Sequence, residues 1–348
     1  MKPLPILVIK IGTSAISQAS GKLDEPRLIE VSRQLARLAD TYRLLLVSSG
    51  AVGCGKSALD DFSGKLIERK AAAAIGNPLL LTTYATFFRA YGLQPAQILC
   101  ERRHFSDRKQ FLQLRDTLEY LWQNDIIPIA NENDVVSNLE LKFSDNDELA
   151  SLLAVGLGAS HLLMVSSVPG LLDESNKTVP VVKQVDAEIM GTARTEKSAG
   201  GLGGMISKLT FARLATRLGI SVTILGLEEP DSIIKATQQQ SGTFFPAQVS
   251  SSNARQRWLA SGSLVSGRIV IDQGAEEALK NRKSLLAVGV VAVQGPFEAN
   301  EVVEIHGPDQ AGGPVALARI RLDALAMEQK LGQQEVMVAH ADEVVLLG

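Results

Sequence analysis

The sequence predicts an α/β protein with a three-layer, open, mostly parallel sheet, followed by a second, small β-rich domain. Short apolar runs of β type alternate with helical patterns up to about residue 225, and several of these runs end in small or polar residues. Strands that alternate with helices imply crossover connections, and therefore parallel neighbours with helices on both faces of the sheet. After about residue 250 short β-type runs dominate, which indicates a separate domain.

Hydrophobic periodicity predicts the elements of the first domain, which we place at residues 1–255. The predicted strands are residues 4–9, 44–47, 97–100, 126–130 and 162–165. Apolar residues at helical spacing predict helices between these strands. The helices are marked by Leu28, Val31, Leu35 and Leu38, by the alanine-rich segment from Ala71, and by Phe111, Leu114, Leu118 and Leu121.

The predicted second domain covers residues 264–348 and is built from short strands. Its β-type runs are residues 267–271, 285–293, 302–305, 315–320 and 343–347. Counted from Val265, this part holds seven Lys or Arg and twelve Asp or Glu residues, a net charge of −5. Such a charge argues against a surface that binds nucleic-acid phosphates.

Composition argues against several classes of protein. The net charge of −3 gives no general reason to expect nucleic acid or a membrane surface as partner. No apolar run reaches the roughly 18–20 residues that a membrane span needs, and residues 1–12 show no signal-peptide cleavage pattern. Cys54 and Cys100 lack metal-type spacing and the four histidines are scattered. We therefore expect a cytoplasmic protein with no metal bound by a dedicated protein site.

Residues 50–57 match the P-loop pattern of glycines followed by Lys56 and Ser57. A P-loop opens directly into a helix whose amide groups hold phosphates. Here Asp60, Asp61 and Gly64 fall where the first turns of that helix would be. These residues indicate that the match is a chance pattern and not a phosphate site.

A second glycine cluster, residues 200–204, leads into a helix marked by Phe211, Leu214 and Leu218. Glycines let backbone amides approach an anion, and a helix start carries partial positive charge. Lys208, in the first turn, would add a full charge. From these residues alone, a phosphate site and a mobile loop with a surface lysine are equally good interpretations.

Two loops rich in Asn and Asp form the third candidate. Residues 131–134 follow a strand, and residues 144–147 precede a helix that begins near Glu148. Taken alone, each loop is equally well explained as a strand end or a helix cap. Two such loops so close together, facing the same strand ends, indicate a polar ligand site.

The basic residues Arg102, Arg103, Arg108 and Lys109 are interspersed with acids, which indicates a solvated helix face or a subunit contact.

Taken in order, residues 8–14, 48–51, 131–134, 144–147 and 203–208 closely resemble the glutamate 5-kinases, a family of the amino acid kinase superfamily. Residues 267–275 look like the start of a PUA domain. The resemblance spans nearly the whole chain and implies an amino acid kinase-like sheet followed by a PUA-like domain. It also implies ATP-dependent phosphorylation of the γ-carboxylate of L-glutamate to glutamyl 5-phosphate, the first step of proline biosynthesis.

The resemblance implies roles for individual residues. Lys10 and Lys208 would contact the transferring phosphoryl group, and Asp147 would orient both. The glutamate site would contain Ser49, Asp134 and Asn146. The ATP site would contain Lys10, Gly12, Ser166, Ser167, Leu202, Gly203, Gly204, Met205, Ile206, Ser207 and Lys208. Two departures lie on the nucleotide side: Ser166 and Ser167 stand where the family usually has Thr-Asp, and Leu202 stands where it has Thr.

The resemblance also implies ATP with Mg²⁺, feedback inhibition by proline, a homo-oligomer, and handover of the labile product to glutamyl phosphate reductase. The rivals within the superfamily act on acetylglutamate, aspartate, carbamate or UMP. A nucleotide acceptor would want a basic pocket, and an acylated amino acid has no ammonium group for Asp134. Outside this class, an RNA-binding PUA protein or an inactive regulator are the alternatives. The charge of the second domain argues against the first, and the presence of Lys10, Asp147 and Lys208 argues against the second.

Overall fold

The computed structural model describes residues 3–18, 23–136, 145–186, 188–191, 202–248, 265–299, 301–309 and 313–347. Within these residues the chain divides into two compact units. The first is made of the described residues within 3–104 and 109–248, and the second of residues 105–108 together with those described within 265–347.

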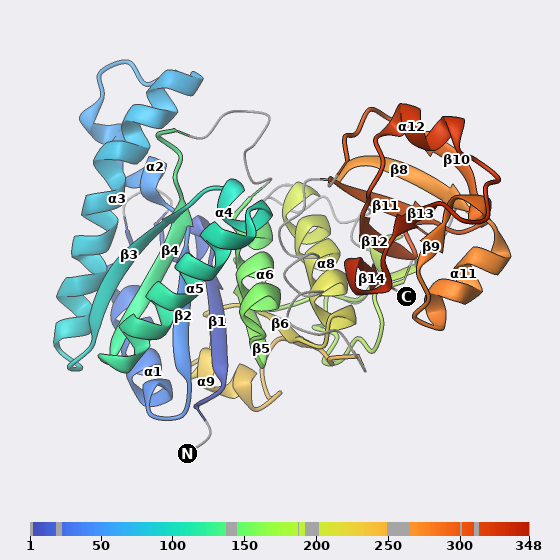
Figure 1. Ribbon diagram of the computed structural model, residues 1–348. Coiled ribbons are helices and arrows are strands. Elements are labelled where there is room, and N and C mark those ends of the chain that lie inside the picture. The colour runs from blue at the N-terminus through green and yellow to red at the C-terminus, as the bar shows by residue number, and fades with distance from the viewer. Residues whose placement is uncertain are drawn as a thin grey trace. The chain divides into compact units, whose positions relative to one another are not determined.

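The first unit is built on a seven-stranded sheet (Figure 1). The strand order is β3-β4-β2-β1-β5-β6-β7, and neighbours are parallel except β6 and β7. The strands are β1 (Ile6–Ile11), β2 (Arg43–Ser48), β3 (Gln94–Cys100), β4 (Ile126–Glu132), β5 (His161–Val165), β6 (Ser221–Leu225) and β7 (Thr243–Phe245). The predicted open, mostly parallel sheet is confirmed.

Helices α1, α3, α6, α8 and α9 contact strands of this sheet, and further helices of the chain lie around them (Figure 1). The helix bounds are α1 (Glu25–Ala39), α2 (Ala51–Gly55), α3 (Leu66–Arg89), α4 (Arg103–Ser106), α5 (Arg108–Gln123), α6 (Asn146–Leu157), α8 (Leu202–Arg217) and α9 (Ser232–Thr237). One hydrophobic cluster joins residues of α1, α3 and α9 to Leu7, Ile9 and Ile11 of β1. Side chains alternate along a strand, so Lys10 lies on the opposite face of β1, where α6 packs.

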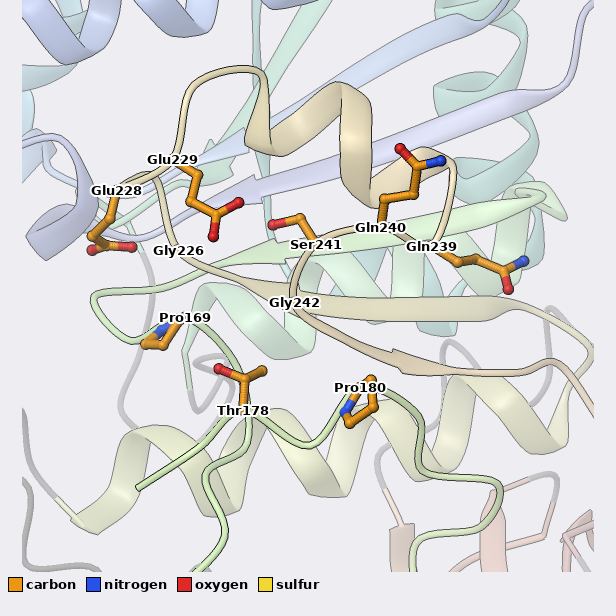
Figure 2. Close-up of a pocket in the computed structure, with 10 residues that line it drawn as sticks. All are labelled: Pro169, Thr178, Pro180, Gly226, Glu228, Glu229, Gln239, Gln240, Ser241 and Gly242. Carbon is orange, nitrogen blue, oxygen red and sulfur yellow. The ribbon is translucent and has the colours of Figure 1, made fainter. Parts of the chain in front are cut away.

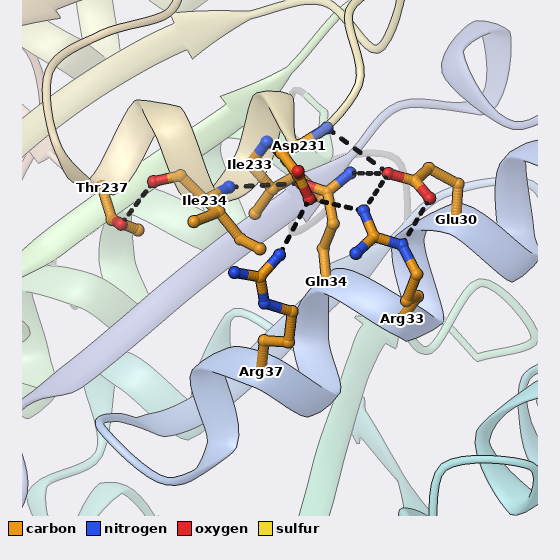
Figure 3. A network of polar contacts seen from close by, with 8 residues as sticks. All are labelled: Glu30, Arg33, Gln34, Arg37, Asp231, Ile233, Ile234 and Thr237. Carbon is orange, nitrogen blue, oxygen red and sulfur yellow. Dashed lines mark hydrogen bonds and ion pairs between the residues drawn. The ribbon is translucent and has the colours of Figure 1, made fainter.

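A buried glutamine holds α9 to α1 (Figure 3). Gln34, 1% exposed, accepts hydrogen bonds from the backbone N–H groups of Ile233 (2.8 Å) and Ile234 (3.2 Å). It thereby satisfies two amides of the first turn of α9, which have no partner within the helix. Arg33 adds an ion pair of 2.5 Å to Asp231, the residue before the helix. The two helices are therefore tied together through polar contacts as well as apolar packing.

α3 is the one helix of the described ranges with the length and apolarity that a membrane crossing would require. Tyr84 and Phe88 of this helix are fully buried in the cluster with β1 and α1. Its inward face therefore has the packing of a core helix.

The second unit contains a five-stranded sheet of order β10-β8-β11-β12-β14 and a two-stranded sheet of β13 and β9. Its strands are β8 (Val265–Ile271), β9 (Leu285–Leu286), β10 (Val290–Gln294), β11 (Val302–His306), β12 (Ala316–Arg319), β13 (Met337–Ala339) and β14 (Val344–Leu346). The prediction of one strand over residues 285–293 was wrong, because a 3₁₀ turn at Ala287–Gly289 divides it. The helices α11 (Gln273–Lys280) and α12 (Ala324–Gln329) were not predicted.

Candidate active site

Three charged side chains from distant parts of the sequence meet in one buried cluster. The Nζ atom of Lys10, in β1, lies 2.7 Å from Oδ1 of Asp147, and Nζ of Lys208, in α8, lies 2.8 Å from Oδ2 of the same carboxylate. The three residues are only 6%, 2% and 7% exposed. Lys208 also donates to the carbonyl oxygen of Gly204 at 3.3 Å. One carboxylate therefore holds both ammonium groups.

Burial and mutual charge decide the protonation of this cluster. Burial lowers the pKa of Lys10 below its ordinary 10.5, Asp147 acts in the opposite direction, and the charge of Lys208 lowers it further. Burial alone would raise the pKa of Asp147, but the two lysines outweigh burial and hold it below 3.8. Asp147 is therefore ionised at neutral pH. Two lysine side chains therefore share one carboxylate, an arrangement that suits a phosphate group.

The start of α6 links this cluster to the glycine-rich end of α8. Asp145 is the N-cap of α6, and its Oδ1 accepts from the backbone N–H groups of Asp147 (2.9 Å) and Glu148 (3.0 Å). Its Oδ2 accepts from the hydroxyl of Ser207 at 2.5 Å. The same side chain therefore caps one helix and anchors the first turns of another. From the sequence, residues 144–147 were interpreted either as a helix cap or as part of a polar ligand site, and Asp145 is the residue that caps the helix.

Of the residues expected to bind the acceptor, Asn146 directly precedes Asp147 in α6, and Ser49 is hydrogen-bonded to Asn146. Asn146 Nδ2 donates to Ser49 Oγ at 2.8 Å and to Asn131 Oδ1 at 3.0 Å. Asn131 in turn donates to Asn77 Oδ1, in α3, at 3.0 Å. Asp134 is half-buried in the turn that follows β4. Ser49 and Asn146 are thus joined by a direct hydrogen bond. Their network also includes Asn131, from the predicted loop of residues 131–134, and Asn77, which was not predicted.

The expected nucleotide residues lie at the ends of β1 and β5 and in the first turns of α8. The backbone N–H of Gly12 donates to the carbonyl oxygen of Val165 at 3.3 Å, and a Cβ at Gly12 would lie 3.4 Å from Lys10 Nζ. Ser166 is half-buried and Ser167 is exposed. The helix α8 begins with Leu202 and Gly203, and Met205, Ile206 and Ser207 in its first turns are half-buried. Ser144, Gly200 and Gly201 lie outside the described residues.

The P-loop-like residues 50–57 form no long helix. Gly50 (φ 116°) precedes α2, which has five residues and is followed by a 3₁₀ turn. A Cβ at Gly55 would lie 2.0 Å from the carbonyl oxygen of Ala72, and one at Gly76 would lie 1.7 Å from that of Ala51. These glycines therefore allow α2 and α3 to approach each other closely.

A cavity of about 410 Å³ lies beyond the ends of β5 and β6 (Figure 2). Its lining includes Pro169, which follows Ser167 by two residues, and Gly226, which directly follows β6. The carboxylates of Glu228 and Glu229 and the amide of Gln240 also line it. The cavity is rich in hydrogen-bond acceptors and is a candidate place for a ligand that carries N–H donors.

Arg102, expected on a solvated face or at a subunit contact, is largely buried and forms an ion pair with Glu148, the residue after Asp147. Across the ranges that the structure describes, no group of three or more His, Cys, Asp or Glu side chains could hold a metal ion.

Comparison with known proteins places the chain in a family. The amino acid kinase family matches residues 5–226, and the PUA domain matches residues 267–341. A glutamate 5-kinase of Kosmotoga olearia is 37% identical over 308 residues, which cover 87% of this chain and 85% of that protein. The glutamate 5-kinases of Pasteurella multocida and Proteus mirabilis are 36% and 35% identical and cover 100% and 98% of both chains.

Among solved structures, a carbamate kinase from Giardia lamblia bound to AMP-PNP has a TM-score of 0.53 at 17% identity. The match covers 71% of this chain and 100% of that one, and at this identity it supports the fold alone. The assignment of the chain to a family therefore rests on the identity and coverage of the sequence relatives. The chain belongs to the amino acid kinase family and, within it, to the glutamate 5-kinases.

Proposed function

We propose that this protein transfers the γ-phosphoryl group of ATP to the γ-carboxylate of L-glutamate, forming glutamyl 5-phosphate and ADP. The observation that carries the proposal is the pair of ammonium groups of Lys10 and Lys208 on the single carboxylate of Asp147. The names of the relatives support glutamate as the acceptor. The reaction would be the first step of proline biosynthesis.

The reaction needs charge compensation more than proton transfer. An oxygen of the γ-carboxylate, already ionised at neutral pH, attacks the γ-phosphorus while the bond from that phosphorus to the leaving oxygen of ADP breaks. No general base is required. The difficulty is that two anions must approach each other. Lys10 and Lys208 offset this repulsion at the transferring group, and Asp147 keeps both directed there.

The acceptor is held by polar groups at the ends of β2 and β4. We propose that Ser49, Asn146 and Asp134 bind the glutamate, with Asp134 opposite its ammonium group. Ser49 is fixed by its own backbone, whose N–H donates to the carbonyl oxygen of Ile11 in β1 at 3.1 Å. The acceptor and the phosphoryl group would thus be positioned by neighbouring strands of one rigid sheet.

For ATP, we propose that the phosphates lie against the first turns of α8, from Leu202 to Lys208, and against Gly12. The amide groups of a helix start favour an anion at this place. Ser166 and Ser167 would approach the nucleotide from β5. The cavity of Figure 2 would accept the amino group of the adenine base on its carboxylates and amides. Mg²⁺, which supplies further charge compensation when bound, would enter with the phosphates.

Several further properties follow from the family as proposals. These are a division into domains at residues 1–255 and 264–348, feedback inhibition by proline, a homo-oligomer, handover of the product to glutamyl phosphate reductase, and a place in the cytoplasm. The exposed apolar residues of α3, Ile67 (71%) and Leu79 (50%), offer a surface for subunit contact. None of these properties is needed for the chemistry above.

An ATP-consumption assay over a panel of acceptors tests the proposal. The panel contains L-glutamate, L-aspartate, acetylglutamate and UMP, and hydroxylamine traps any acyl phosphate as a hydroxamate. We expect hydroxamate with glutamate alone, and its loss in the Lys208→Met variant. Turnover of acetylglutamate or UMP at a higher rate than glutamate, or hydroxamate formation by the lysine variant at the wild-type rate, would reject the assignment.

A further inference from the structure

The hydrogen bonds around Asn146 have a direction that can be assigned from one backbone group. The N–H of Glu132 lies 2.9 Å from Asn131 Oδ1. A backbone N–H can only donate, so the atom that faces it must be the oxygen of the Asn131 amide. Asn131 therefore turns its Nδ2 toward Asn77, which accepts with Oδ1, and its Oδ1 toward Asn146, which donates with Nδ2.

This direction determines what the acceptor site offers to a substrate. Both hydrogens of Asn146 Nδ2 are used, one on Asn131 at 3.0 Å and one on Ser49 at 2.8 Å. The Oδ1 atom of Asn146 is then the atom available to a ligand, and it can only accept. Ser49 accepts from Asn146, so its own hydroxyl hydrogen is available to donate. Asn146 thus offers an acceptor to an ammonium group of the substrate, and Ser49 offers a donor to a carboxylate of the substrate.

Asn77 holds the far end of this chain of amides in place. Asn77 and Asn131 are 4% and 5% exposed, so water does not readily replace either partner. If Asn77 lost its carbonyl oxygen, Nδ2 of Asn131 would be buried without this acceptor, a costly arrangement that drives the side chain to rotate. Asn146 would then lose one of the two acceptors that orient its amide.

We propose that Asn77, on α3, is a positioning residue that selects for a free α-ammonium group on the substrate. It acts through Asn131 on Asn146 and Ser49, and it contacts no reacting atom. The inference rests on the proposed function, since it assumes that Asn146 and Ser49 bind the amino-acid acceptor. It adds a residue outside the site to the determinants of substrate choice.

The test compares L-glutamate with glutarate, the same dicarboxylate without the amino group. We measure kcat/KM for both acceptors, and KM for ATP, in the wild type and in Asn77→Leu, Asn77→Ala and Asn77→Asp. The Leu and Ala variants should raise KM for glutamate about tenfold and reduce the preference for glutamate over glutarate by a similar factor, with KM for ATP unchanged. Asn77→Asp keeps an acceptor oxygen and should retain the preference.

Thr223→Val is the matched control. It removes another buried hydrogen bond, of 2.9 Å to His161 Nε2 at the other end of the sheet, and should leave the preference unchanged. The inference is overturned if both apolar Asn77 variants keep the wild-type preference, or if KM for ATP rises as much as KM for glutamate. Failure of the wild type to phosphorylate glutamate would instead reject the proposed function, so the two failures are distinguishable.

Discussion

Replacing Asp147 by asparagine removes the shared negative charge of the two lysines and leaves the side-chain shape nearly unchanged. In the wild type, each carboxylate oxygen pairs with one ammonium group, at 2.7 and 2.8 Å. Asparagine has a single acceptor oxygen, and its NH₂ group would face the other lysine as a second donor. Two buried ammonium groups would then remain with at most one acceptor between them.

The magnitude follows from the burial of the three side chains, which are 8%, 3% and 9% exposed. Removing one partner of a buried ion pair costs about 3–5 kcal/mol of the free energy of unfolding, because the remaining charge is uncompensated. Lys10 can relieve part of this cost by losing its proton, since burial already lowers its pKa. A neutral or displaced Lys10 no longer stabilises the transferring group, so we expect kcat to fall by about 10²–10³.

Urea unfolding between pH 3 and pH 9, together with steady-state kinetics at pH 7.5, measures both effects. The lowered pKa of Asp147 means that its contribution to stability is present above pH 3.8 and is lost as pH falls below that value. The lowered pKa of Lys10 means that the cost of its charge diminishes as pH rises toward 10.5. The difference in free energy of unfolding between the wild type and Asp147→Asn should therefore be largest between pH 3.8 and pH 10.5 and should become smaller at acid pH.

The control is Asp116→Asn, whose carboxylate is 69% exposed and pairs with Arg115 on the surface. Such a pair contributes about 0–1 kcal/mol. The reasoning is refuted if Asp147→Asn costs less than about 1 kcal/mol, as a surface pair does. It is also refuted if this difference in free energy of unfolding does not change with pH, because the charge of Asp147 would then not stabilise the two buried lysines.

Two further predictions concern the scaffold. Gln34→Leu should reduce the free energy of unfolding by about 1–3 kcal/mol, because two buried amides at the start of α9 lose their acceptor; an unchanged urea midpoint would contradict this. His161 has its pKa lowered to about 4 by burial, from 6.5. Its contribution to stability is therefore present above pH 6.5 and lost as pH falls toward 4. His161→Gln should remove about 3 kcal/mol of that pH dependence, measured by urea unfolding at pH 4 and 7.5, and identical pH profiles would contradict it.

The sheet could be predicted from the sequence because its central strands are buried on both faces. All residues of β1 and β5 are buried, and such strands appear as short apolar runs between helical patterns. The second unit was harder to predict. The apolar run over residues 285–293 contains a turn at Ala287–Gly289, and hydrophobicity alone does not reveal where a strand bends. The helix α11 begins with Asp272 as N-cap, a signal present in the sequence and not used.

The candidate site was only partly predictable, because its supporting contacts join residues that no local pattern connects. Asn77 lies within an apolar helix, where nothing in the neighbouring residues indicates a partner on β4. Arg102 was assigned to a solvated face or a subunit contact because acids surround it in the sequence. Its partner Glu148 is on α6, and folding alone brings the two together. The lysine cluster was expected from family resemblance, whereas the glycine cluster alone left Lys208 ambiguous.

The start of α6 explains how one short segment can organise both halves of such a site. Asp145, Asn146, Asp147 and Glu148 follow one another, and their side chains contact Ser207, Ser49, the two lysines and Arg102 respectively. In the first turn of a helix, successive side chains point in directions about 100° apart, so each reaches a different neighbouring element. The positive end of the helix also favours three acids there. A shift of this turn would therefore disturb the acceptor contacts and the lysine pair together. Changes in α6 should affect both acceptor binding and the positioning of the phosphoryl group. Changes at Asn77 should affect acceptor binding alone.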